Sequence, residues 1–135
     1  MANETTLIFE IALPIPYTCA DNTGIEKGAI LKLSDPMTAS LASGAGSIVA
    51  GIAAEEKIAN DGKTKIAVYT KGIFKGLAGG AITVGDALIS DTTGATNEIL
   101  TAGVNAENIL GRALETAADT DTFLFELNPF TANLA

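Results

Sequence analysis

The sequence of 135 residues contains no histidine, no tryptophan and a single cysteine. Histidine is the commonest general base and metal ligand in proteins, so its absence excludes Ser-His-Asp and Cys-His catalysis in their standard forms. One cysteine allows no disulfide within the chain, and without histidine it leaves no structural zinc site. We expect Cys19 to be a buried, inert thiol, because its sequence neighbours include no basic residue that would activate it.

Basic residues are also scarce. Eight lysines and arginines stand against sixteen acidic residues, which gives a formal net charge of −8. Affinity for nucleic acids and for anionic membranes depends largely on basic side chains, so both kinds of partner are excluded on charge. No apolar stretch approaches the roughly 18 residues of a membrane span, and Glu4 and Glu10 around the first apolar run argue against a signal peptide.

Aromatic residues make up only 5% of the chain, whereas hydrophobic residues reach 47% and charged residues 18%. This balance argues against disorder, and the length predicts one domain. The abundant small residues predict thin, closely packed layers. We hypothesise that such a domain needs partners to complete its core.

No set of residues suited to catalysis stands out. Glu55 and Glu56 would face opposite sides of a strand, and Asp119 and Asp121 flank a predicted turn. The glycine-rich stretch 76–85 matches neither a P-loop nor a dinucleotide-binding fingerprint. The acidic turn lacks the rest of a calcium-binding loop. We therefore predict that the protein is not an enzyme and has no catalytic residues, no cofactor and no bound metal.

Short apolar runs separated by turn residues dominate the chain, which is typical of an all-β barrel or sandwich. The predicted strands cover residues 6–11, 28–33, 37–41, 48–58, 64–74, 87–89, 96–100, 109–116 and 122–127, with one helical turn over 104–108. The sequence Asn60-Asp61-Gly62 predicts a hairpin that joins 48–58 to 64–74. No internal repeat is evident.

The N-terminal region is the most unusual segment. Pro14 and Pro16 follow the first strand, and proline cannot donate to a sheet, so this region is an edge strand, an extended arm or both; an ordinary first barrel strand is the alternative. We predict residues 1–23 as the N-terminal arm or edge strand, 24–128 as the β-barrel domain and 129–135 as a tail. The predicted interface residues of the arm are Leu7, Ile8, Phe9, Ile11, Pro14 and Pro16.

Several short segments carry a family resemblance in their order and spacing. They are GIEKGAILKL, IVAGIAAEEK, TKIAVYTKGIFKG, ITVGDALISD, ILGRALET and TFLFEL. The matching positions are Gly28 to Leu31, Ala50 to Ala53, Val68 to Phe74, Gly85 to Asp91, Leu110 to Leu114 and Phe125 to Leu127. Over residues 24–128 the chain resembles the small capsid cement, or decoration, proteins of tailed phages and related viruses.

The resemblance implies a small β-barrel or β-tulip-like sandwich that binds the outer surface of a shell built from a major capsid protein. It implies a trimer on the shell, assembled in the host cytoplasm, that holds neighbouring capsomers together without enzymatic activity. Two alternatives remain open. One is another virion surface component, such as a fibre or spike domain, and the other is a small-molecule-binding β-barrel.

Overall fold

The computed structural model describes residues 4–93, 97–103 and 106–131, and every regular element in this part of the chain is a β-strand. The strands are β1 (Thr6–Glu10), β2 (Ile15–Thr18), β3 (Ile30–Asp35), β4 (Thr38–Leu41), β5 (Ser43–Ala45), β6 (Val49–Ala53), β7 (Lys65–Tyr69), β8 (Gly72–Ala78), β9 (Ala87–Thr93), β10 (Glu98–Thr101), β11 (Asn108–Ala113) and β12 (Thr122–Thr131). The predicted all-β fold is confirmed. Residues 104 and 105 of the expected helical turn, Thr96 of an expected strand and the ends 1–3 and 132–135 lie outside the described residues.

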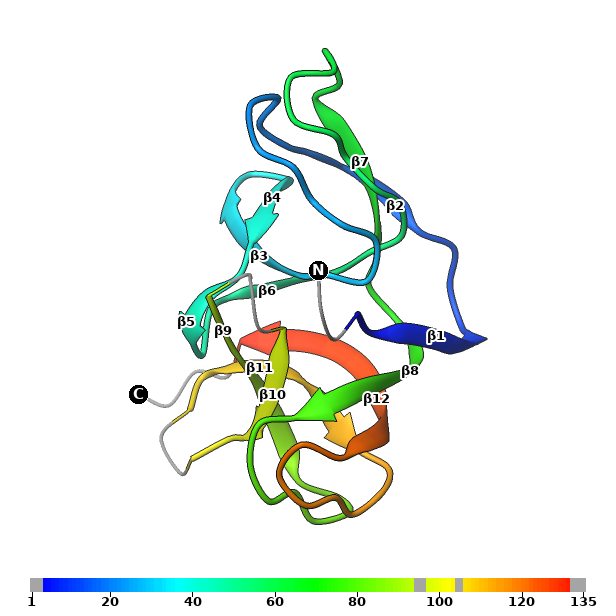
Figure 1. Cartoon of the computed structure of the whole chain (residues 1–135), viewed down its shortest axis with the longest axis vertical. Coiled ribbons are helices and arrows are strands. Elements are labelled where there is room, and N and C mark those ends of the chain that lie inside the picture. The colour runs from blue at the N-terminus through cyan, green and yellow to red at the C-terminus, as the bar shows by residue number, and fades with distance from the viewer. Residues whose placement is uncertain (1–3, 94–96, 104–105, 132–135) are drawn as a thin grey trace.

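The first half of the chain forms a closed barrel of five strands in the order β2-β4-β3-β6-β7. Neighbouring strands are antiparallel except β2 and β4, which run parallel and meet where Thr18 lies opposite Thr38. The predicted hairpin is confirmed, because β6 and β7 pair with Ile52 opposite Tyr69. This barrel occupies the upper part of Figure 1.

The second half forms another ring of strands, in the order β8-β10-β9-β11-β12, which the pairing of β8 with β12 closes. Here too one neighbouring pair, β8 and β10, is parallel, and the others are antiparallel. Two further strands attach to this second barrel. β1 pairs with β8, and β5 pairs with β9.

The two barrels are the same structural unit, present twice. β2, β3, β4, β6 and β7 of the first barrel pair with one another in the same pattern as β8, β9, β10, β11 and β12 of the second. An isolated bridge joins the same two loops in each barrel, Ile25 to Lys57 and Ile82 to Ala117. The expectation that the chain has no internal repeat was therefore wrong.

We call residues at equivalent places in the two barrels counterparts. The strand pairings make counterparts of Ile25 and Ile82, Gly28 and Gly85, Leu31 and Leu88, Gly51 and Gly111, and Val68 and Phe125. Backbone conformation agrees with this alignment. φ is +88° at Gly28 and +92° at Gly85, and it is +49° at Met37 and +51° at Asn97. Left-handed conformations are uncommon outside glycine, so their recurrence at counterparts supports a true repeat.

The interiors of the barrels are filled in complementary ways. In the second barrel, Phe125 on β12 fills the space beside Gly76, where a Cβ would lie only 2.9 Å from the Phe125 ring. In the first barrel the counterparts are Val68 and Tyr17, so the small residue and the aromatic residue have exchanged strands. Because cores are packed to near-crystalline density, a large side chain at one place requires a small one opposite.

The second barrel is closed at one end by the outer face of the first. Ile30 and Ile52 point out of the first barrel, are buried, and belong to the same hydrophobic cluster as Phe74 and Phe125. The Asn97 side chain accepts a hydrogen bond from the Ile30 amide and donates one to the Gly28 carbonyl. Strand β6 accordingly lies next to β11 and β12 of the second barrel in Figure 1.

Candidate interaction surfaces

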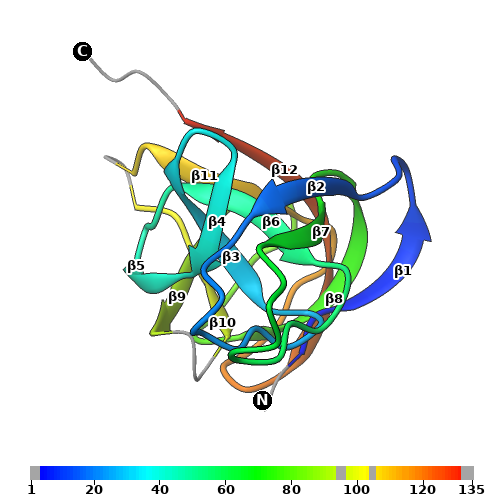
Figure 2. The ribbon, with the colours of Figure 1, turned by 90° about the horizontal axis from the view of Figure 1, so that it is seen from above.

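The first candidate surface is the N-terminal strand. β1 pairs with β8, and a bulge interrupts the register between Leu7 and Phe9. The bulge breaks the alternation of faces, so Ile8 and Phe9 are both exposed, Phe9 to 62%, while Leu7 is half-buried against the core of the second barrel. Figure 2 shows β1 at the outside of the molecule, away from the barrel axes.

The exposed apolar surface continues along the chain between β1 and β2. Ile11 is exposed, and Leu13, which was not among the predicted interface residues, is 74% exposed and so more exposed than Ile8, Phe9 or Ile11. We call residues 8–13 the apolar segment. Bulky side chains that succeed one another at this exposure are typical of a surface that a partner covers.

The two prolines lie next to this segment, at the start of β2. Pro16 pairs with β7 on one side. On the other side β2 pairs with β4 at Thr18 and not at the prolines. The counterparts of Pro14 and Pro16 are Ile73 and Lys75 of β8, the residues to which β1 adds. A proline offers no N–H to an incoming strand, so the first barrel does not present the strand-addition site that β1 fills on the second.

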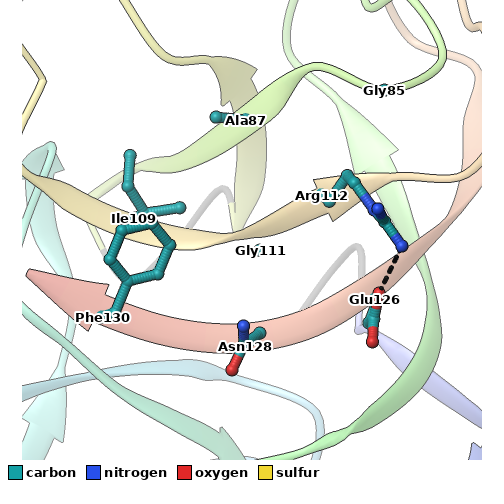
Figure 3. A pocket seen from close by; sticks show the side chains of 8 residues that line it. All are labelled: Gly85, Ala87, Ile109, Gly111, Arg112, Glu126, Asn128 and Phe130. Atoms are coloured by element: carbon teal, nitrogen blue, oxygen red, sulfur yellow. Dashed lines mark hydrogen bonds and ion pairs between the residues drawn. The ribbon is translucent and has the colours of Figure 1, made fainter. Parts of the chain in front are cut away.

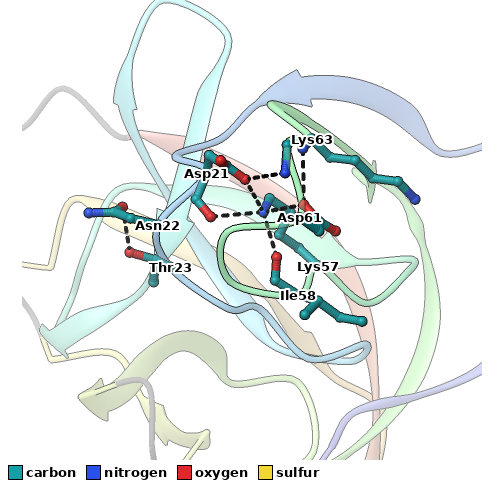
Figure 4. A network of polar contacts seen from close by, with 8 residues as sticks. Asp21, Asn22, Thr23, Lys57, Ile58, Asp61 and Lys63 are labelled. Carbon is teal, nitrogen blue, oxygen red and sulfur yellow. Dashed lines mark hydrogen bonds and ion pairs between the residues drawn. The ribbon is translucent and has the colours of Figure 1, made fainter.

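A polar network closes the far end of the first barrel (Figure 4). The Lys57 side chain is 1% exposed, and its Nζ lies 2.7 Å from Asp61 Oδ1 and 3.0 Å from Asp21 Oδ1. The ammonium also donates to the carbonyls of Asp21 and Ile58. Asp21 and Asp61 in turn accept the amides of Gly62 and Lys63, so one buried cation ties two loops together.

The pKa values in this network follow from its contacts. Burial alone lowers the pKa of Lys57, but hydrogen bonds to Asp61 and Asp21 outweigh it and hold that pKa above its usual value. The hydrogen bond from Lys57 holds the pKa of Asp61 below its usual value. Burial raises the pKa of Cys19. Cys19 is buried, as the sequence predicted.

A shallow groove of about 340 Å³ lies on the outside of the second barrel, over β9, β11 and β12 (Figure 3). Its floor consists of small residues, Gly85, Ala87 and Gly111. Ile109 and Phe130 line one end, and an ion pair of 2.9 Å between Arg112 and Glu126 crosses the other. Phe130 is half exposed there. Nothing in the sequence indicated this groove, because its residues come from strands that are distant along the chain.

The acidic residues considered for catalysis have contacts that organise turns. Glu55 accepts the amide of Ala67, and its counterpart Glu115 accepts the amide of Leu124 in the same way. Asp121 accepts the amide of Ala118 across its turn. Within the described residues, no three histidine, cysteine or acidic side chains come together as a possible metal site. No helix of the described chain is long and apolar enough to span a membrane.

Comparisons with known proteins point in one direction. A family model described as phage cement protein matches residues 11–127. No curated protein sequence matches the chain significantly. Among solved structures, the fold is similar to the crystal structure of the head fiber gp8.5 N base in bacteriophage phi29, with a TM-score of 0.55 and 18% identity over 89% of this chain and 97% of that one. At this identity the likeness concerns the fold.

Proposed function

Because the chain belongs to the phage cement protein family, we propose that it binds the outer surface of an assembled phage capsid and stabilises contacts between capsomers. The partner would be the major capsid protein, and copies of the chain would meet as trimers on the shell. The role is mechanical and not enzymatic. The net charge of −8 suits a component that must not bind the packaged nucleic acid.

The exposed apolar segment supports the choice of contact surface. Ile8, Phe9, Ile11 and Leu13 are each more than 40% exposed and succeed one another within six residues. β1 pairs with β8 along one edge, and strand addition to its other edge would supply main-chain hydrogen bonds from a few residues. We propose that this segment, with Leu7, Pro14 and Pro16 beside it, grips the capsid or a neighbouring subunit.

The test is co-sedimentation with intact phage particles. Phe9→Ser combined with Leu13→Ser removes two exposed side chains without touching the core. Burying large apolar side chains is worth about 1.5–3 kcal/mol each, and these two are already partly buried in the free protein, so we expect a loss of about 2–3 kcal/mol, or roughly 30- to 150-fold in Kd. Ile58→Ser, at a site 64% exposed on the far loop, is the matched control and should bind normally. Equal binding of all three proteins would exclude the segment, and no saturable binding by the unaltered chain would exclude the cement role.

One alternative has a specific observation in its favour. The fold similarity covers 97% of a phage head fiber base, which supports a base domain of a virion surface fibre. Images of decorated particles distinguish the two roles, because a cement protein occupies many sites between capsomers and a fibre base carries a projecting structure. A small-molecule-binding barrel has less support, since side chains of the described residues fill both barrel interiors.

A further inference from the structure

The two barrels contact each other through one surface on each barrel. Each of these two surfaces has a counterpart on the other barrel that is left uncovered. In each barrel, five strand ends or adjoining turns meet at one end: the starts of the first, third and fourth strands and the ends of the second and fifth. In the second barrel this end contains Phe74, Ser90 and Asn97, all fully buried, and Phe74 and Asn97 contact the face of the first barrel.

In the first barrel the same end is uncovered. The counterparts of Phe74, Ser90 and Asn97 are Ile15, Leu33 and Met37, and these are 39%, 39% and 51% exposed. Ile48, whose carbonyl accepts the amide of Leu33, is also exposed there. We call these four residues the open end. An end that is buried in one copy of the unit and apolar but exposed in the other is a surface without its partner.

The face that covers such an end also has an uncovered counterpart. The first barrel covers the second with Ile30, Ile52 and Tyr69, around the backbone of Gly28; the rings of Tyr69 and Phe74 are 5.7 Å apart. Their counterparts are Ala87, Arg112, Glu126 and Gly85. These four residues all line the groove in Figure 3, as do Ile109 and Gly111, the counterparts of Val49 and Gly51.

We propose that the open end of one copy docks into the groove of another copy of this chain, in the arrangement by which the second barrel docks on the first. The chain itself supplies the precedent, since both surfaces are counterparts of surfaces that already fit each other. Ala87 is smaller than its counterpart Ile30, which leaves room for Leu33 and Met37, both bulkier than their counterparts Ser90 and Asn97. Met37 takes the place of Asn97, and its flexible thioether suits an uneven groove.

The differences between the two contacts fit an interface that forms between copies. The groove carries the Arg112–Glu126 ion pair where the internal face has Ile52 and Tyr69, so it tolerates water in the free protein. Interfaces that form and separate are more polar than permanent ones. The contact is head-to-tail, and such contacts close into rings when their rotation allows it. The inference goes beyond the proposed function by naming the surfaces through which copies meet, and it does not depend on capsid binding.

Disulfide trapping between two differently labelled proteins tests this docking. In a Cys19→Ala background, which gives Cys19 the identity of its counterpart Ala78, one protein carries Met37→Cys and the other Ala87→Cys. In the internal contact the counterparts Asn97 and Ile30 are 2.9 Å apart between side-chain oxygen and amide nitrogen, so the two cysteines should come within disulfide reach. Mixed under mild oxidation, they should form the mixed dimer well above either homodimer.

The reaction is run at millimolar protein and again on decorated particles, because avidity on the shell replaces high concentration. Ile58→Cys mixed with Ala87→Cys is the matched control and should give only background cross-linking. In the chain that keeps Cys19 and has no introduced cysteine, Met37→Glu should weaken self-association by about tenfold or more, since docking would bury a charge without a partner. Mixed dimers no more abundant than in the control, under both conditions, would overturn the proposal even if capsid binding is normal. Loss of capsid binding with mixed dimers intact would overturn only the cement role.

Discussion

The exchange of large and small residues between the barrels predicts a specific coupling between Gly76 and Phe125. A Cβ at Gly76 would lie 2.7 Å from Ile99 Cδ1 and 2.9 Å from Phe125 Cε1, closer than carbon atoms approach. Gly76→Ala should therefore destabilise the protein by about 1–3 kcal/mol, as overpacking of a dense core does. Phe125→Val introduces the residue found at the counterpart position, Val68, and should cost about 2–3 kcal/mol, below the range for truncating phenylalanine to alanine.

Together the two changes should be less harmful than their sum. Removing the Phe125 ring vacates the space that the new methyl group enters, so we expect a favourable coupling energy of about 1–2 kcal/mol. Urea unfolding of the unaltered chain, both single variants and the double variant measures it. The control combines Gly76→Ala with Phe130→Val. Phe130 is exposed and lies on the same strand as Phe125, and the effects of these two changes should be additive. Additivity of Gly76→Ala and Phe125→Val within about 0.5 kcal/mol would refute the exchange of volume between counterparts.

Two further changes test the repeat and the polar network. Gly111→Ala places a Cβ onto the carbonyl oxygen of Glu126 and should lower the unfolding midpoint strongly, whereas Gly103→Ala meets nothing within 4 Å and should not; equal midpoints would contradict the strand pairing. Asp61, whose folded pKa is lowered, stabilises the fold above its usual pKa of 3.8 and loses that contribution as pH falls through the folded value. Lys57, whose folded pKa is raised, contributes fully below its usual pKa of 10.5 and loses this as pH rises through the folded value. The difference in Tm between the unaltered chain and Lys57→Met should therefore be largest between these limits, and a difference independent of pH would contradict the network.

The sequence was informative where the cause of structure is local. Alternating apolar residues and turn signals predicted the all-β class, and Asn60-Asp61-Gly62 predicted the β6–β7 hairpin. The family resemblance over residues 24–128 agrees with the family model that matches 11–127. The proposed contacts of Leu7, Ile8, Phe9, Ile11, Pro14 and Pro16 stay predictions, although the structure exposes most of these side chains.

The sequence did not reveal the repeat, because only some counterparts are identical residues, such as Ile25 and Ile82 or Leu31 and Leu88. Tyr17 and Val68 do the work of Gly76 and Phe125, so a comparison by residue identity finds little at the positions that matter most. Glycine recurs where the backbone requires a positive φ, as at Gly28 and Gly85. Nothing in the sequence indicated the groove either, because its residues form one surface only after the strands have paired. Lys57 was missed as well, since nothing local in the sequence distinguishes a buried lysine from an exposed one.

The pairing of β1 with β8 has a consequence for the order in which the protein folds during synthesis. Thr6 lies opposite Lys75, so β1 leaves the ribosome well before its partner strand exists. The strands of the first barrel all precede residue 70, so this barrel can form before β8 is made, but Ile30 and Ile52 remain uncovered until the second barrel forms. We therefore expect folding to proceed from the N-terminus, with the first barrel as the surface on which the second assembles and β1 added only after β8 has appeared. Contacts this distant in sequence close slowly, so we expect the attachment of β1 to be a late step.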